Sequence, residues 1–295
     1  MLKLHFSILL LGLTGVIGKY VQISPAPIVF ARTAVAVVIL LAIIKFKGLP
    51  WPSRKSFWSS FPVGLLLAVH WMTFFHSIQV SSVAIGLLSF STYPVFVAIL
   101  DPLFNRTRFR LHDLLFAGFA FVGLLIVLQD DPAGHAVFAG VFWGILAGFT
   151  CALLTIWNKH RVRHEDPINM GMLQNFWAAV VSLPFAPALV EANVIDLGLL
   201  ICLGAFCTAL AHYLFIAALK SVRAQVASIA VGLEPFYGIL FATLLLHEWP
   251  TSLEIGGGLI ILAAVLLSAW TSKRDPARAQ TLPRKKIVLP SHPAP

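Results

Sequence analysis

Charged side chains are scarce in this sequence. Only 11% of the 295 residues are Asp, Glu, Lys or Arg, whereas a soluble domain carries about a quarter. A water-soluble fold must cover its surface with charge, so the shortage excludes an ordinary soluble enzyme. The 59% share of hydrophobic residues excludes a disordered chain. Together with a mean hydropathy of +0.88, these figures indicate a membrane protein.

Cysteines are few, and their spacing has no recognisable pattern. Cys151, Cys202 and Cys207 all lie in apolar stretches, and none of them belongs to a CxxC pair. An odd number of cysteines without that spacing predicts neither a disulfide framework nor a zinc site. We therefore expect three small buried side chains.

Motifs for nucleotides, cofactors and metals are also missing. The glycines at 256–258 lie inside an apolar run and follow no strand, so they form no dinucleotide fingerprint. His247 and Glu248 are not followed by a histidine at position 251, which excludes the zinc-protease motif. We expect no cofactor, no metal and no catalytic residue, and hence no enzyme. The absence of a phosphate-binding loop makes ion gradients or substrate exchange the expected energy source.

Long apolar runs are what the chain has instead. A helix needs about 20 apolar residues to cross a bilayer. The first run has no cleavage site after it, so we expect it to stay as a spanning helix. The ten predicted spans are Leu4–Tyr20, Pro25–Ile44, Phe57–Val80, Val83–Leu103, Leu111–Leu128, Ala136–Trp157, Ile168–Val190, Leu197–Leu219, Ala224–Leu246 and Ser252–Trp270.

Basic residues are distributed unevenly over the breaks between the spans. If the N-terminus is cytoplasmic, 19 of the 21 Lys and Arg fall on the cytoplasmic side, which leaves Lys19 outside and Arg32 within a span. This satisfies the positive-inside rule. It also explains the net charge of +9 by contact with anionic lipid rather than nucleic acid. We predict a multi-pass protein of the inner (plasma) membrane with both termini in the cytoplasm.

The chain contains an internal repeat. Aligning Pro94 with Pro235 places the third to fifth spans on the eighth to tenth, with no gap from about residue 70 to residue 128, and it puts Tyr93 on Glu234. Because each repeat has an odd number of helices, the two halves cross the membrane in opposite orientations, as in secondary carriers. The predicted fold is an all-α integral membrane protein of ten transmembrane helices, arranged as two inverted five-helix repeats. The predicted units are residues 1–130, residues 131–271 and a disordered, basic, Pro-rich cytoplasmic tail at 272–295.

Several segments resemble EamA-type permeases of the drug/metabolite transporter superfamily. They are Trp71-Met72-Thr73-Phe74-Phe75, Val83-Ala84-Ile85-Gly86-Leu87-Leu88, Tyr93-Pro94-Val95-Phe96, Ala211-His212-Tyr213, Leu233-Glu234-Pro235 and Glu254-Ile255-Gly256-Gly257-Gly258. The resemblance covers roughly residues 4 to 271. It implies ten helices, two five-helix repeats, cytoplasmic termini, and export or exchange of small metabolites such as amino acids.

Two charged residues, Arg32 and Glu234, lie well away from the ends of their predicted spans, where each costs a few kcal/mol. Glu234 is at mid-span directly before Pro235, which breaks the helix. Its carboxyl either handles a proton or a cationic group, or it pins the helix joint. Arg32 either reaches an anionic group of a solute, or it snorkels outward or pairs with a carboxylate. Because no second Lys or Arg lies away from the ends of a span, the sequence disfavours phosphorylated solutes.

The remaining candidate residues are aromatic or polar. We predict that aromatic rings and Glu234 line a solute cavity, although each could instead be a packed core residue. The predicted cavity residues are His70, Trp71, Phe75, Tyr93, His212, Tyr213 and Glu234. Asn158, Gln174 and Asn175 are expected to form hydrogen bonds between helices. The ridge of Gly140, Gly144 and Gly148 predicts close helix packing, within the chain or in a homodimer.

The function prediction is a secondary transporter of a small organic metabolite. We expect efflux or exchange of an amino acid or a similar amphoteric solute by alternating access, with a proton or counter-solute as its partner. Two Pro-broken helix pairs, the third with the fourth and the eighth with the ninth, would rock about the centre. The alternatives are a membrane-embedded enzyme acting on a lipid or isoprenoid, an uptake carrier of another metabolite class, and a membrane scaffold without transport activity.

Overall fold

The described part of the chain is helical throughout. The structure is a computed structural model, and it describes residues 2–21, 23–106, 111–130, 135–222 and 224–274. Among these residues no strand occurs. Arg108, Arg110 and Arg223, which belong to the predicted cytoplasmic charge count, lie outside the described residues, as does the predicted tail from residue 275 onward.

The first half of the chain forms seven α-helices and one short 3-10 helix. They are α1 (Leu2–Tyr20), α2 (Pro25–Phe46), α3 (Arg54–Ser59), α4 (Phe61–Val80), α5 (Val83–Phe90), α6 (Tyr93–Asn105), α7 (Leu111–Val127) and η1 (Leu128–Asp130). Local sequence explains several of the starts. Ser82, for example, caps α5 by accepting a hydrogen bond from the backbone N–H of Ile85 at 3.0 Å.

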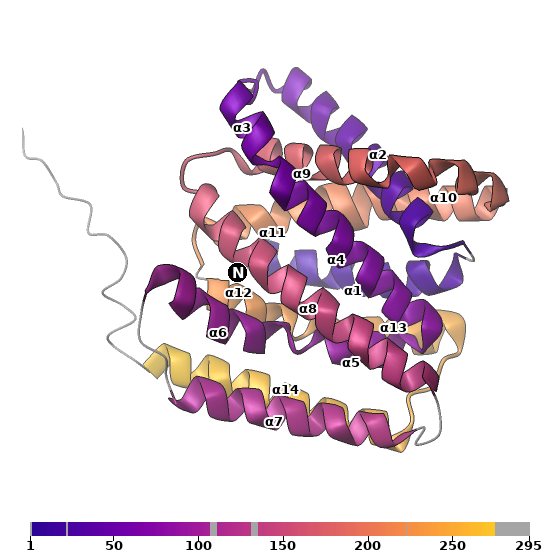
Figure 1. The fold of residues 1–295 in the computed structure, drawn as a ribbon, viewed down its shortest axis with the longest axis vertical. Helices are drawn as coiled ribbons and strands as arrows, with labels where there is room; N and C mark the ends of the chain where they lie inside the picture. Colours follow the sequence, from indigo (N-terminus) through magenta and orange to yellow (C-terminus); the bar gives the residue numbers. More distant parts are fainter. Residues whose placement is uncertain (1, 22, 107–110, 131–134, 223, 275–295) are drawn as a thin grey trace, which may run out of the picture.

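The second half forms a similar series, shown with the first in Figure 1. The elements are α8 (His135–Arg161), α9 (Pro167–Ser182), η2 (Leu183–Glu191), α10 (Val194–Cys202), η3 (Leu203–Leu210), α11 (Ala211–Leu219), α12 (Ala224–Val231), α13 (Glu234–Leu246) and α14 (Ser252–Arg274). The segment η3 is a π-helix, which the sequence did not predict. Asp166 caps α9 through a bond from the N–H of Ile168 at 2.8 Å.

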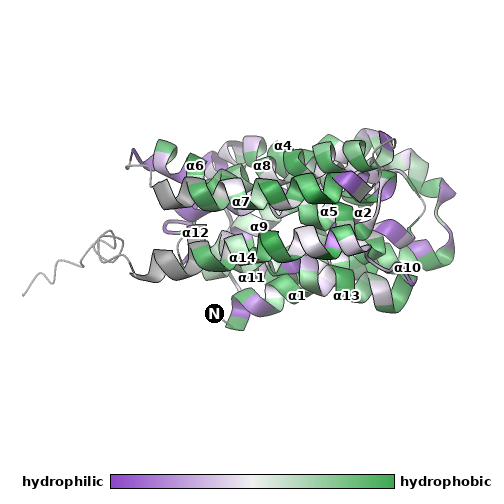
Figure 2. Cartoon of the chain, turned by 90° about the horizontal axis from the view of Figure 1, so that it is seen from below, coloured by the Kyte–Doolittle hydropathy of each residue, from purple (hydrophilic) through white to green (hydrophobic). Residues whose placement is uncertain are grey.

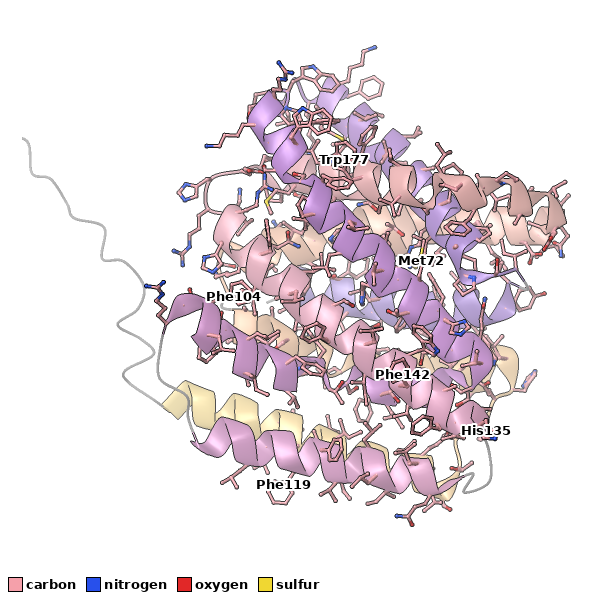
Figure 3. All side chains as sticks on the ribbon, in the orientation of Figure 1. Met72, Phe104, Phe119, His135, Phe142 and Trp177 are labelled. Carbon is pink, nitrogen blue, oxygen red and sulfur yellow. The ribbon has the colours of Figure 1, made fainter. Side chains whose placement is uncertain are left out.

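The helices are long and apolar enough for a multi-pass membrane protein. Seven helical stretches of the described chain have the length and hydropathy to cross a membrane, and three shorter apolar helices accompany them. Figure 2 shows that the middles of the helices are mainly hydrophobic and that hydrophilic residues gather toward the two ends of the bundle. Large side chains such as Phe119 point outward and are about half exposed (Figure 3), as expected of a lipid-facing surface.

Two long helices are interrupted in the same way. Helices α5 and α12 have 8 residues each, and α6 and α13 have 13 residues each. Each pair is separated by two residues, and Tyr93 and Glu234 are the first residues after the breaks. Arg106 and His247, which follow α6 and α13, both adopt a left-handed backbone, with φ of 52° and 56°. A single offset in residue number matches α5 with α12 and α6 with α13 at both their first and their last residues.

Close helix contacts hold the middle of the bundle together. A Cβ added at Gly144 would lie 2.5 Å from the Cβ of Ser89, and one at Gly148 would lie 3.1 Å from the carbonyl oxygen of Phe90. The glycine ridge of α8 therefore packs against the end of α5 within the same chain. At one edge of the molecule, α7 and α14 lie side by side (Figure 1).

The ten predicted spans coincide largely with helical residues. The fourth and ninth contain the breaks before Tyr93 and Glu234, and three others are less regular than predicted. The third is divided into α3 and α4 at Ser60, where Pro62 begins a new helix. The eighth passes from α10 through the π-helix η3 to α11. The seventh ends in the 3-10 segment η2, which contains Pro184 and Pro187. Proline cannot donate the backbone hydrogen bond that an α-helix needs at these positions.

Candidate functional site

A small cavity lies in the middle of the helix bundle. Its volume is about 70 Å³, and α1, α4, α8, α11 and α13 all contribute residues to it. The lining combines apolar, aromatic and polar side chains: Leu11, Thr14, Leu67, His70, Trp71, Phe74, Phe90, Cys151, Leu154, Thr155, Asn158, His212, Phe215, Val231 and Glu234. Four of the seven predicted cavity residues (His70, Trp71, His212 and Glu234) are therefore brought together at one place.

Glu234 brings a carboxyl group to this cavity. It is the first residue of α13, directly after the break that follows α12, and it is 4% exposed. Its side chain forms no hydrogen bond or ion pair with any other residue of the described chain. Helix α1 approaches this point closely, because a Cβ added at Gly12 would lie 3.3 Å from the carbonyl oxygen of Glu234. The backbone at Glu234 is therefore packed against α1, while its carboxyl lines the cavity.

Arg32 on α2 points into the bundle and does not snorkel outward. Its guanidinium carbon lies 4.0 Å from the centre of the Trp71 ring, a cation–π contact. Its Nε donates to Thr208 Oγ1 at 2.8 Å, and its Nη2 donates to the carbonyl oxygen of Cys207 at 3.3 Å. The third nitrogen, Nη1, is buried and has no hydrogen-bond partner in the described structure.

The cation and the carboxyl belong to one electrostatic cluster. Arg32 interacts electrostatically with Glu234, His70 and His212. No carboxylate of the described residues lies within ion-pair distance of Arg32, so its charge is balanced only by dipoles, the aromatic ring and Glu234 at longer range. A buried cation without a direct carboxylate partner is expensive, which makes this position a candidate for a functional role.

The two histidines are fixed by hydrogen bonds to neighbouring helices. His70 Nδ1 is 2.9 Å from the carbonyl oxygen of Ala147 on α8. His212 Nδ1 is 3.3 Å from the side-chain nitrogen of Asn175 on α9, and its ring meets Trp71 edge to face at 6.0 Å. Each ring thereby lines the cavity in one fixed orientation.

The other three predicted cavity residues lie behind the lining. Tyr93 is fully buried, and its hydroxyl is 2.6 Å from Thr155 Oγ1, which does line the cavity. The ring of Phe75 packs against α1 at Gly18, where an added Cβ would overlap the ring. Tyr213 packs with residues of α2 and α9. Thr14, Phe74, Phe90, Cys151 and Thr155 belong to the lining but were absent from the predicted set.

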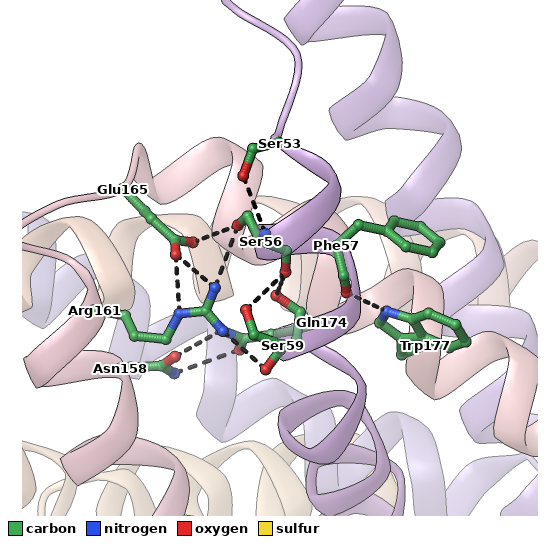
Figure 4. Close-up of polar contacts among 10 residues, drawn as sticks. Ser53, Ser56, Phe57, Ser59, Asn158, Arg161, Glu165, Gln174 and Trp177 are labelled. Atoms are coloured by element: carbon green, nitrogen blue, oxygen red, sulfur yellow. Dashed lines mark hydrogen bonds and ion pairs between the residues drawn. The ribbon is translucent and has the colours of Figure 1, made fainter.

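The amide side chains connect helices as the sequence suggested. Gln174 Nε2 donates to Asn158 Oδ1 at 2.6 Å, which joins α9 to α8 beside the cavity. Figure 4 shows this pair below a second polar cluster at the end of α8. There Arg161 donates two hydrogen bonds to Glu165, at 3.0 and 2.5 Å, and one to the carbonyl oxygen of Ser59 at 3.0 Å.

A wider groove opens beside this second cluster. Its volume is about 930 Å³, and α3, α8 and the start of α9 supply most of its polar residues. The groove is larger than the central cavity, but it gathers no buried unpaired charge among the residues that the structure describes. The central cavity is therefore the better candidate for a recognition site.

Comparisons with known proteins agree with this architecture. A model of the EamA-like transporter family matches residues 2–129 and 138–270. The uncharacterized transporter YxxF of Bacillus subtilis (strain 168) is 22% identical, over 90% of this chain and 88% of its own. The S-adenosylmethionine uptake transporter of Rickettsia bellii (strain RML369-C) is 24% identical, over 88% and 89%. A solved crystal structure with 14% identity matches with a TM-score of 0.65, covering 92% of this chain and 97% of that one, which shows a similar fold.

Proposed function

This chain belongs to the EamA-like transporter family, and from that premise we propose that it is a secondary carrier of a small amphoteric metabolite, such as an amino acid. The observation that carries the proposal is the arrangement of Arg32 and Glu234. The carboxyl of Glu234 lines the aromatic cavity, and the guanidinium of Arg32, with one buried nitrogen that has no hydrogen-bond partner, stacks on Trp71 of the same lining. A solute with an anionic and a cationic group complements both charges at once.

The proposed architecture is ten membrane-spanning helices in two inverted five-helix repeats. It is supported by the equal lengths of the interrupted helices, by the single shift that superimposes both pairs and by the left-handed residues that follow both. The family model also matches the chain twice, once in each half. The charge distribution supports an inner-membrane location with cytoplasmic termini.

Alternating access follows from the size of the cavity. Sites for drug-sized ligands have volumes of roughly 300–1,000 Å³. The central cavity has only about 70 Å³, so the helices around it must separate before a solute can enter. The breaks between α5 and α6 and between α12 and α13 are the natural points of bending, because backbone hydrogen bonding is interrupted there.

The direction of transport and the solute class complete the proposal. We propose efflux or exchange, as the sequence resemblance implies, whereas the Rickettsia relatives carry the name of an uptake transporter. S-adenosylmethionine itself carries an amino-acid group, so its recognition chemistry includes the one proposed here. A membrane enzyme acting on a lipid is the rival function.

The test is flux in proteoliposomes with three matched solutes: an amino acid, the amine that lacks its carboxyl, and the acid that lacks its amine. We expect wild-type protein to transport the amino acid faster than either truncated solute. Arg32→Lys keeps a charge but loses the planar contact with Trp71, and we expect it to weaken binding of carboxylate-bearing solutes about tenfold or more. Binding of the amine should change little.

The outcomes separate the candidate functions. Equal transport of all three solutes, or an equal loss for all three in Arg32→Lys, would refute the amphoteric site. Chemical turnover of a lipid without solute flux would establish the enzyme instead. Protection of cells from a toxic amino-acid analogue by overproduction would establish export, and sensitisation would establish uptake.

A further inference from the structure

Two lysines, one on α1 and one on α8, each bind carbonyl groups at the end of a neighbouring helix. Lys19, near the end of α1, donates from Nζ to the carbonyl oxygens of Ile78 and Ser81 at 3.0 and 2.5 Å. These carbonyls belong to the end of α4 and to the short loop that leads into α5. Lys19 thus ties α1 to the turn between α4 and α5.

Lys159 makes the same contact in the second half of the chain. It lies near the end of α8 and donates from Nζ to the carbonyl oxygen of Leu219 at 2.6 Å and to that of Val222. These acceptors lie at the end of α11 and in the loop before α12. The repeat alignment that pairs Pro94 with Pro235 also pairs Ile78 with Leu219 and Ser81 with Val222. Both lysines therefore bind the equivalent pair of carbonyls.

The chemistry of these contacts is strong and specific. The last carbonyl groups of a helix have no partner within the helix, and that end carries partial negative charge. A lysine ammonium satisfies two such carbonyls at once and stabilises the charge. Both lysines are partly buried, so water competes weakly for the same bonds.

The two contacts lie at opposite ends of the bundle. Arg161, two residues beyond Lys159, donates to the carbonyl oxygen of Ser59 just before the start of α4, whereas Lys19 binds the far end of α4. Helix α4 has 20 residues, which corresponds to a length of about 30 Å. The lysines therefore act close to the two opposite surfaces of the membrane.

We propose that Lys19 and Lys159 are the latches of two gates, one on each side of the membrane. This inference rests on the proposed carrier function, in which the pairs of interrupted helices swing to open the cavity. Each latch holds the turn of one pair against α1 or α8 while that side is closed. Opening of one side breaks one latch and leaves the other intact.

Other contacts at the first latch fit the same role. Glu248 accepts a hydrogen bond from the backbone N–H of Val83, and Glu254 accepts one from Ser82 Oγ, both at 3.0 Å. They hold the start of α5 to the loop that connects α13 with α14 and to the start of α14. Lys19 binds the preceding turn to α1, so its removal breaks only the contact between α1 and that turn.

The chain contains its own probe of gate opening, because Cys151 lines the central cavity. Cys202→Ala and Cys207→Ala leave Cys151 as the sole thiol. A membrane-impermeant maleimide is applied to intact cells or to inverted vesicles, and the rate of Cys151 labelling is measured from each side. We expect Lys19→Met to raise labelling about tenfold or more from one side, and Lys159→Met to raise it similarly from the opposite side.

Lys220→Met is the matched control, because Lys220 is exposed and lies in the loop that Lys159 holds. It should label like the parent protein from both sides. If a methionine variant does not accumulate in folded form, Lys19→Gln or Lys159→Gln retains a donor, and its smaller one-sided increase supports the proposal. Unchanged labelling in both lysine variants, or increases from the same side, would overturn it.

The test is independent of the transported solute and of the orientation in the membrane. A reversed orientation exchanges the two sides but keeps the two variants opposite to each other. Failure of amphoteric solutes to cross wild-type proteoliposomes would contradict the proposed function, whereas the labelling pattern reports on the latches alone.

Discussion

Gly64 offers a direct test of how closely α4 and α9 must approach. A Cβ added at Gly64 would overlap the Cβ of Trp177, and it would lie 2.9 Å from the carbonyl oxygen of Gln174 and 3.2 Å from the backbone nitrogen of Ala178. These are main-chain or Cβ atoms, so no flexible side chain can move aside. Favourable carbon contacts begin near about 3.5 Å, and Gly64→Ala therefore has to separate the two helices by about 1 Å.

The expected cost follows from two opposing terms. Overpacking of a tight contact costs about 1–3 kcal/mol. Alanine is a better helix former than glycine by about 1 kcal/mol, which partly offsets that cost. Gly118→Ala on α7 is the matched control, because an added Cβ there would have no atom within 4 Å. Both variants gain the same helix propensity on replacement of glycine by alanine. The difference in their free energies of unfolding therefore gives the overpacking cost alone.

The measurement is thermal unfolding of both purified variants in one detergent. A difference of about 1–3 kcal/mol corresponds to roughly 2–10 °C, with Gly64→Ala the less stable. Because α4 carries His70 and Trp71, we also expect Gly64→Ala to reduce solute flux. Equal melting temperatures for Gly64→Ala and Gly118→Ala would refute the close packing of α4 on α9.

Two further predictions concern the charged clusters. Glu234→Gln preserves the shape of the side chain but fixes it in a neutral form. In proteoliposomes we expect this variant to retain solute exchange and to lose solute accumulation driven by a pH gradient. Accumulation equal to that of the wild type would exclude Glu234 as the coupling group. Arg161→Met removes the pair with Glu165 and the bond to Ser59, and we expect a loss of about 1 kcal/mol that shrinks at high salt. Thermal unfolding at low and high salt measures it, and a salt-independent loss would contradict an electrostatic origin.

Most of the helical framework was predictable because it depends on composition along the chain. Apolar runs of about 20 residues must be helical in a bilayer, and turn residues separate them. The predicted starts at Pro25, Val83, Ala224 and Ser252 coincide with observed helix starts. The resemblance to EamA-type permeases is confirmed by the family match. The π-helix η3 was not predictable, because its geometry depends on contacts with α2 such as the approach of Val35 to Gly204.

The site was predictable in its chemistry but less so in its geometry. Glu234, His70, Trp71 and His212 stood out as polar or aromatic residues in apolar spans, and all four line the cavity. Periodicity alone could not separate the lining from the layer behind it, so Tyr93 and Phe75 were assigned to the cavity although other side chains cover them.

The roles of Lys19 and Lys159 were missed, because charged residues at span ends are normally attributed to topology. A signal was nevertheless available in the sequence. Each half of the chain has a lysine near the end of its first span, and the internal repeat makes the short breaks after Val80 and Lys220 equivalent. The pairing of each lysine with the break in its own half depends on how the helices pack, which only the structure shows.

The small volume of the cavity has a consequence for how binding and movement are coupled. With about 70 Å³ available, the cavity beside Glu234 cannot hold an amino acid in this conformation. A solute therefore binds only a conformation in which the helices have separated, and its differential affinity shifts the equilibrium toward that conformation. The unsatisfied Nη1 of Arg32 makes the closed, solute-free state costly. The latch at each end lowers the free energy of the closed state, and this opposing contribution keeps the carrier from opening before a solute provides the compensating contacts.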